Sequence, residues 1–192
     1  MSAPLDPRTP VLVGTGQVTN RGDRLLEPME LMVEAACLAL ADTGGAVVDR
    51  IQSVQVVNLL SWSYPAPAGE LAARLGLDEG ERLSTTIGGN TPQWLMARAC
   101  DAVASGRLDG VLIAGAEALD SAKRARDQDV SLDRGDREAV PAEQVVGDDR
   151  TGIGPAELAA GLMAPAALYP LFESALAARA GRSPWGRWRS SR

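Results

Sequence analysis

Residues 84–119 read STTIGGNTPQWLMARACDAVASGRLDGVLIAGAEAL, and this stretch decides the fold because it predicts a strand, a turn, a helix and a second strand in succession. The first strand is the β-branched run Ser84–Ile87. The helix has Pro92 in its first turn and apolar residues at helical spacing, and the second strand is the apolar run Gly110–Ala114. The stretch therefore predicts one strand–helix–strand unit of a parallel sheet.

The turn inside this unit is the most informative feature for function. Gly88 and Gly89 end the strand, and Asn90 and Thr91 offer side-chain oxygens that can cap the following helix. Backbone N–H groups and the positive end of the helix dipole meet at such a turn. The turn is therefore suited to hold an anion or the oxygen of a thioester.

Composition excludes several classes of function. The chain has 192 residues and a net charge of -6, which fits one substantial domain and argues against nucleic acid as a partner. No apolar run reaches the length of a membrane span, and residues 1–10 lack the pattern of a signal peptide, so we expect a cytoplasmic protein. The chain has no histidine, which removes the commonest activating base and the commonest zinc ligand. We expect no metal site.

Two short motifs have competing interpretations. Cys37 and Cys100 lie on predicted helix faces among Ala and Leu, where we expect small buried hydrophobes rather than reactive thiols. Gly14 and Gly16 follow a predicted buried strand at Val11–Val13 and could form a nucleotide-phosphate turn or a purely structural one. The structural alternative is favoured because the third glycine of the nucleotide motif is replaced by Thr19.

Strands and helices alternate along the first two thirds of the chain. After the strand at Val11–Val13, the sequence predicts a helix over Pro28–Thr43, a strand over Ile51–Leu60 and a helix over Gly69–Leu77. Together with residues 84–119, this order predicts an α/β fold of mostly parallel β-α-β-α-β-α-β layers. The loop 61–67 follows the second strand, where Trp62 and Tyr64 could line a pocket or simply pack.

Four segments organise the chain. Residues 1–9 are expected to be a flexible lead-in, 10–119 the α/β domain and 120–183 a charged and helical insertion. Within the insertion, helices are expected over Pro155–Ala164 and Pro170–Ala180. Residues 184–192 (PWGRWRSSR) differ in composition from the rest, and they could be a basic aromatic tail or a non-native ending. The second alternative is favoured because the fold before the tail is unfinished.

The GGNTPQ turn and the helix YPLFESAL resemble the thiolase superfamily, the enzymes that make or break carbon–carbon bonds in acyl-CoA thioesters. The resemblance covers about Pro10–Ser183 and is closest to actinobacterial acetyl-CoA acetyltransferase-like and sterol-carrier-type thiolase-like proteins. It implies that this chain is the N-terminal half only, without the fifth strand of that half. It also implies acyl-CoA as substrate or ligand, with no covalently bound cofactor, in lipid metabolism.

The resemblance also implies partners. Family members usually dimerise through the third strand and the helix after it, which places Ser84, Thr85, Thr86 and Ile87 at a two-fold interface. The alternative partner is an OB-fold protein in a thiolase-like hetero-complex.

The nucleophile that the resemblance implies is missing. In active thiolases a cysteine stands in the turn before the long helix, and Gly89 takes that position here. Thr91 is a weak candidate because its alcohol needs a base, and Cys100 lies about 12 Å or more into the helix at 1.5 Å per residue. We therefore expect an acetyl-CoA acetyltransferase-like protein that is truncated and catalytically inactive.

Two alternatives stay open. The first is a non-catalytic subunit that binds acyl-CoA or scaffolds a partner. The second is a part of a thiolase-like steroid side-chain retro-aldolase, whose acid and base groups would be tyrosines; the chain offers only Tyr64 and Tyr169.

Overall fold

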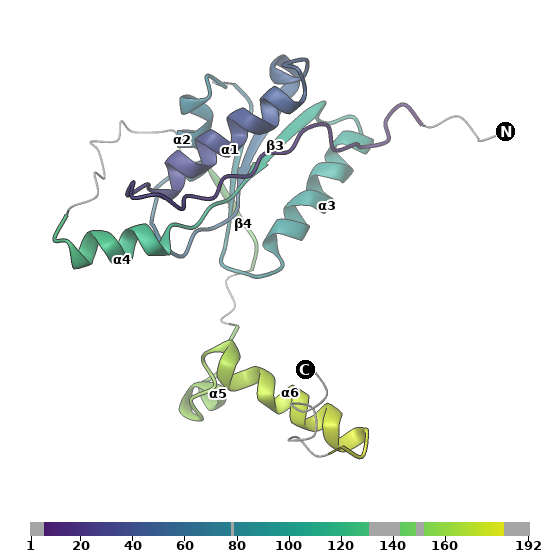
Figure 1. Cartoon of the computed structure of the whole chain (residues 1–192). Helices are drawn as coiled ribbons and strands as arrows, with labels where there is room; N and C mark the ends of the chain where they lie inside the picture. Colours follow the sequence, from purple (N-terminus) through teal and green to yellow (C-terminus); the bar gives the residue numbers. More distant parts are fainter. Residues whose placement is uncertain (1–5, 78, 131–142, 149–151, 183–192) are drawn as a thin grey trace. The chain divides into compact units, whose positions relative to one another are not determined.

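The chain divides into two compact units, Met1–Asp149 and Arg150–Arg192, shown in Figure 1. The structure, a computed structural model, describes residues 6–77, 79–130, 143–148 and 152–182. The ending predicted at 184–192 therefore lies outside the described residues. Each unit is described by itself below.

The first unit is built on a four-stranded parallel sheet. Its strands are β1 (Ile51–Val56), β2 (Glu81–Thr85), β3 (Gly110–Ala114) and β4 (Gln144–Val146), in the order β3-β1-β2-β4. In the central register, Val54 pairs with Arg82 on one side and with Leu112 on the other. The α/β fold with a parallel sheet, predicted from the alternating pattern, is confirmed.

Helices cover both faces of this sheet (Figure 1). On one face, α1 (Pro28–Asp42) and α2 (Pro67–Arg74) pack on the strands. The core between them contains fully buried aliphatic and sulfur side chains, among them Met29, Met32, Val54, Val56 and Leu71. On the other face, α3 (Thr91–Ala104) buries Leu95, Ala99 and Ala102. A helix of nine residues, α4 (Leu119–Asp127), follows β3.

The helix α3 begins where the sequence predicts it. Thr91 is its first residue, Pro92 lies in the first turn, and Gly106 follows the C-cap with a φ of 71°. A positive φ favours glycine because other residues pay a steric penalty there. The short helix η1 (Val48–Arg50) leads into β1.

The prediction of a strand at Val11–Val13 is wrong. These residues are extended but unpaired, and their side chains are 72%, 72% and 54% exposed. The segment packs on α1 instead: side-chain atoms added at Gly14 and Gly16 would overlap the backbone oxygens of Ala39 and Ala35. Glycine at these two positions is therefore required by close packing on a helix, which supports the structural interpretation of the motif.

The burial predicted for the cysteines is also wrong in part. Cys37 is exposed and Cys100 is half-buried, and both are free thiols. The buried residues of α1 include Met29, Met32 and Ala36, a stripe that follows helical spacing. Cys37 comes one residue after that stripe, so the helix turns it by about 100° towards solvent.

The residues predicted as an insertion contribute to both units. The helix α4 and the strand β4 belong to the first unit, where β4 pairs with β2 and forms an edge of the sheet. The second unit contains α5 (Pro155–Ala159) and α6 (Pro165–Arg179). The helix α6 starts five residues before its predicted start, and Pro170 lies inside it. Within the described ranges, no helix has both the length and the apolar character needed to cross a membrane.

Candidate functional site

The glycine turn is open to solvent at one position and closed at another. Gly89 is exposed, and a Cβ atom added there would meet nothing within 4 Å. Thr91, by contrast, is only 6% exposed, and its hydroxyl donates to the backbone oxygen of Gly88 at 2.7 Å. Asn90 is the N-cap residue, but its side chain makes no capping hydrogen bond. The turn therefore has room for a ligand atom beside Gly89, whereas the hydroxyl of Thr91 is already used in a hydrogen bond within the turn.

A cavity of about 1000 Å³ lies in the first unit at the carboxyl ends of β1 and β2. This is the end of a parallel sheet at which ligands usually bind. Its walls come from the loop after β1, from the end of β2, from α4 and from Val145 of β4. Most of the walls are apolar or neutral, and Arg126 is the one charged residue among the described lining residues. The cavity therefore suits a ligand with a long uncharged part.

The loop after β1 supplies the aromatic wall of the cavity. Trp62 and Tyr64 both line it, together with Leu59, Leu60 and Ser63. The sequence offered two interpretations of this loop, and the structure combines them. Trp62 is partly buried against the core, and Tyr64 is 9% exposed, so the two residues pack while they line the cavity.

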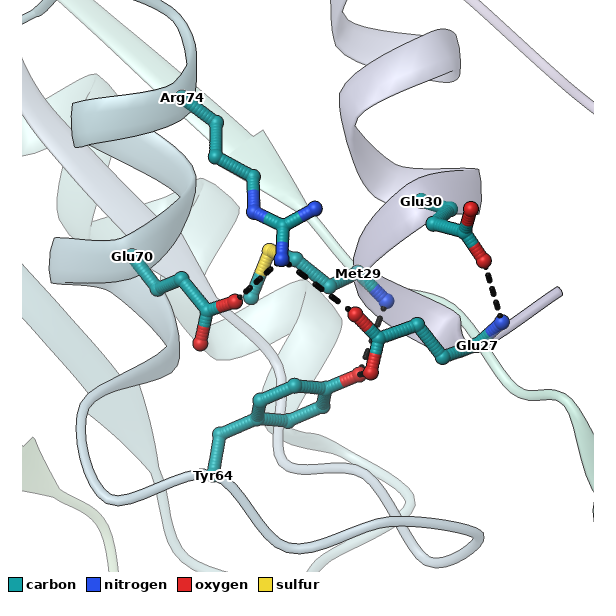
Figure 2. Close-up of polar contacts among 6 residues, drawn as sticks. All are labelled: Glu27, Met29, Glu30, Tyr64, Glu70 and Arg74. Atoms are coloured by element: carbon teal, nitrogen blue, oxygen red, sulfur yellow. Dashed lines mark hydrogen bonds and ion pairs between the residues drawn. The ribbon is translucent and has the colours of Figure 1, made fainter. Parts of the chain in front are cut away.

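Tyr64 is fixed by a polar network that Figure 2 shows. Its hydroxyl donates to Glu27 Oε2 and accepts from the N–H of Met29, both at 3.1 Å. Glu27 and Glu70 in turn pair with Arg74, at 3.4 Å and 2.8 Å. The phenol is thus committed to joining the loop before α2 to the start of α1. Tyr169, the other candidate for acid–base chemistry, lies on α6 in the second unit.

Glu117 holds the same loop from the opposite side. Its carboxylate, just after β3, accepts hydrogen bonds from the N–H groups of Leu60 at 2.6 Å and Ser61 at 2.8 Å. The Ser61 hydroxyl accepts a bond from the N–H of Ala118 at 3.0 Å. Burial alone raises the pKa of the Glu117 carboxyl, but the hydrogen bonds from Leu60 and Ser61 outweigh it and the pKa is lowered. The sequence analysis did not identify this residue.

The lowered pKa of Glu117 predicts a pH-dependent stability. A carboxyl whose folded pKa is depressed stabilises the fold fully above its unfolded pKa and loses that effect as the pH falls through the folded value. Glu117→Gln is therefore expected to be less stable than the parent protein at neutral pH, with a difference that shrinks over the pH range below the ordinary carboxyl pKa of 4.5. Urea unfolding across this range tests it. Glu34→Gln, at an exposed site on α1, is the control; a pH-independent difference for Glu117→Gln would contradict the assignment.

A second carboxylate anchors the wall formed by β4. Glu143 Oε2 accepts hydrogen bonds from the N–H groups of Ala68 at 2.8 Å and Gly69 at 3.0 Å, in the first turn of α2. The N-cap residue of α2 supplies no side-chain bond of its own, so Glu143 replaces it. The N–H of Thr86 donates to the oxygen of Val146 at 2.9 Å. These contacts hold Val145 in the cavity wall.

Two of the four residues predicted for a two-fold interface, Ser84 and Thr85, are buried inside the sheet. Ser84 and Thr85 are 6% and 1% exposed, because β2 pairs with β1 on one side and with β4 on the other. The strand therefore has no free edge for a second copy. Thr86 is half-buried and bonds β4, and Ile87 is 69% exposed.

The turn and the cavity are neighbours. Ile87 lines the cavity, as do Ser84 and Thr85, whereas the residues 88–91 are not among its described lining residues. The glycine turn therefore begins one residue beyond the cavity wall.

The sheet, the glycine turn before α3 and the following helix and strand together define a thiolase-like fold. The crystal structure of a monomeric SCP2-thiolase like protein type 1 from Mycobacterium smegmatis is similar to this chain, with 36% sequence identity and a TM-score of 0.50. The similarity covers 58% of this chain and 24% of that one, so the chain spans about a quarter of that protein's length. A scan of family models and a search of curated proteins each gave no match.

Proposed function

We propose that this chain is a thiolase-like protein that binds an acyl-CoA thioester and does not turn it over. The observation that carries the proposal is the cavity of about 1000 Å³, whose wall ends one residue before a helix-start turn with no nucleophile. The 36% identity to an SCP2-thiolase like protein supports acyl thioesters as the ligand class. The setting is acyl-CoA metabolism.

The lining residues match the parts of such a ligand. A pantetheine arm carries amide groups, for which Asn58, Ser61 and Ser63 offer polar partners. An acyl chain needs apolar surface, which Leu59, Leu60 and Trp62 provide. Turnover needs an activated nucleophile, and position 89 carries no side chain while the Thr91 hydroxyl is engaged. Binding without catalysis follows from this combination.

Filling the cavity tests the proposal. Ala122 lines the cavity from α4, so Ala122→Trp is expected to weaken binding of acetyl-CoA and of a longer acyl-CoA at least about tenfold in calorimetric titration. The matched control is Lys123→Trp, at the next residue of the same helix, which is exposed and does not line the cavity. Its affinity should equal that of the parent chain.

Two results would contradict the proposal. One is equal affinity of Ala122→Trp and the parent chain, which would place the ligand elsewhere. The other is release of free CoA from acetoacetyl-CoA at a rate above the uncatalysed background, because the chain as it stands has no residue to carry that reaction.

A further inference from the structure

One arginine of α4 lines the cavity. Arg126 lies in the last turn of this helix, and within the described part of the chain its guanidinium has no hydrogen-bond or ion-pair partner. Arg124, on the same helix, donates to the backbone oxygens of Gly22 and Asp23 at 3.2 Å and 3.1 Å. It also pairs with Asp120 at 3.7 Å. Arg124 therefore ties α4 to the residues before α1, whereas Arg126 is left for a ligand.

The place of Arg126 on the helix brings it to the cavity wall. Ala122, Ala125 and Arg126 all line the cavity, and residues three and four positions apart share one face of a helix. Both alanines are short, so Arg126 carries the longest side chain of this face. Lys123, on the same helix, is exposed and is not among the described residues of the wall.

The walls do not neutralise the charge of Arg126. No aspartate or glutamate is among the described lining residues. The carboxylates that hold the walls, Glu117 and Glu143, accept hydrogen bonds from backbone N–H groups instead. The whole chain has a net charge of -6, which repels anions, so a negatively charged ligand needs a local cation in the cavity. The cavity therefore favours a ligand that brings an anionic group to α4.

Arg126 and the glycine turn belong to different sides of the cavity. The helix α4 follows β3, the turn follows β2, and β1 lies between these two strands. Two strand spacings of about 4.8 Å separate β3 from β2, which is about 10 Å in total. A group bound by Arg126 is therefore not the thioester beside Gly89 itself, but a group joined to it by a linker.

We propose that Arg126 binds an anionic group of the acyl thioester and so selects charged thioesters for the cavity. Two anions are remote enough from the thioester: a phosphate of CoA, at the far end of the pantetheine arm, and a carboxylate at the end of an acyl chain. A guanidinium can bind either with two parallel hydrogen bonds. This inference rests on the proposed function, because it takes the thioester to lie at the turn.

Three thioesters distinguish the two anions in calorimetric titration. S-acetylpantetheine is uncharged, acetyl-CoA adds the phosphates, and S-adipoylpantetheine adds a carboxylate at the end of the acyl chain. Arg126→Gln is expected to weaken binding of acetyl-CoA at least about fivefold if Arg126 holds a phosphate, and of S-adipoylpantetheine if it holds the carboxylate. The expected loss is modest because Arg126 is exposed and water screens its charge. The affinity for S-acetylpantetheine should equal that of the parent chain.

Lys123→Gln is the matched control. It removes the same charge from the same helix outside the cavity wall, so the net charge changes equally while the contact stays. The affinities for all three thioesters should equal those of the parent chain. A loss as large as that of Arg126→Gln would overturn the proposal, because net charge and not a contact would then determine the affinity.

The failure of this proposal differs from the failure of the proposed function. If the parent chain binds the thioesters and Arg126→Gln binds both charged ones equally well, this proposal is overturned and the proposed function stands. An equal loss of S-acetylpantetheine would also overturn it, because the substitution would then act on the shape of the cavity. If the parent chain binds none of the three thioesters, the proposed function fails and this proposal fails with it.

Discussion

Ser53→Ala is expected to lower the free energy of unfolding of the first unit by about 2–4 kcal/mol, because the serine hydroxyl is the link of a buried polar chain. Gln55 Nε2 donates to Ser53 Oγ at 3.0 Å, and Ser53 Oγ donates to Glu81 Oε2 at 2.8 Å. Glu81 Oε1 then accepts from Arg98 of α3 at 3.1 Å. Ser53 and Gln55 are both 0% exposed. Without the hydroxyl, the amide of Gln55 is left in the core with no partner.

Gln55→Leu is the matched substitution, and its expected effect is opposite or absent. The Oε1 atom of Gln55 is buried and has no hydrogen-bond partner among the described residues. Replacing the amide by an apolar group of similar size removes this unsatisfied atom and leaves the bond from Ser53 to Glu81 in place. Urea unfolding should give a change between zero and about 1 kcal/mol of added stability. Equal destabilisation by both substitutions would show that packing, and not the hydrogen bonds from Gln55 through Ser53 to Glu81, determines the loss of stability.

Local pattern predicted most of the sheet correctly and failed where pairing is non-local. The helix α3 and the strand β3 were predictable because their caps, spacing and apolar runs lie within the same stretch. Val11–Val13 has the composition of a strand, but a strand also needs a neighbour, and the nearest edge, β3, does not bond to it. The three residues of β4 pair with β2 despite a charged surrounding sequence, so hydropathy gave no signal for them.

The position of the candidate site was predictable from the sequence, but the hydrogen bonds that hold its walls in place were not. The aromatic loop after β1 was expected at the carboxyl end of a strand, and it lines the cavity there. Glu117 and Glu143 were missed because their bonds join residues 56 or more positions apart in the sequence. A signal for Glu117 does exist, because it is the one acidic residue in the apolar stretch IAGAEAL.

Gly89→Cys is expected to convert the turn from inert to reactive without loss of stability. Position 89 is open on all sides for a Cβ atom, and its φ lies outside the left-handed region, so the side chain fits without strain. The start of α3 lowers the pKa of a thiol placed there, which raises the fraction of thiolate at neutral pH. In a Cys37→Ser, Cys100→Ala background, the introduced thiol should react with iodoacetamide at least about tenfold faster than a free cysteine in solution at the same pH.

The same variant separates binding from catalysis. If the cavity holds an acyl thioester, the introduced thiolate attacks its carbonyl carbon, the bond from that carbon to the sulfur of CoA breaks, and CoA leaves as the thiol after taking a proton from water. Intact mass should then show one acetyl group per chain after incubation with acetyl-CoA, and no further turnover, because the chain has no histidine to act as a base in a second step.

A neighbouring position supplies the control for this acylation. A Cβ atom at Gly88 would lie 2.9 Å from Asn90 Oδ1 and 3.2 Å from Thr91 Cγ2, so a thiol there is crowded by the turn itself. Gly88→Cys in the same background should acylate at least about tenfold more slowly than Gly89→Cys. Equal rates at the two positions would mean that acetyl-CoA reacts from bulk solution, and that the turn holds no bound thioester. A fast, saturable reaction at position 89 alone would instead mean that the turn holds a bound thioester in reach of a nucleophile at this position.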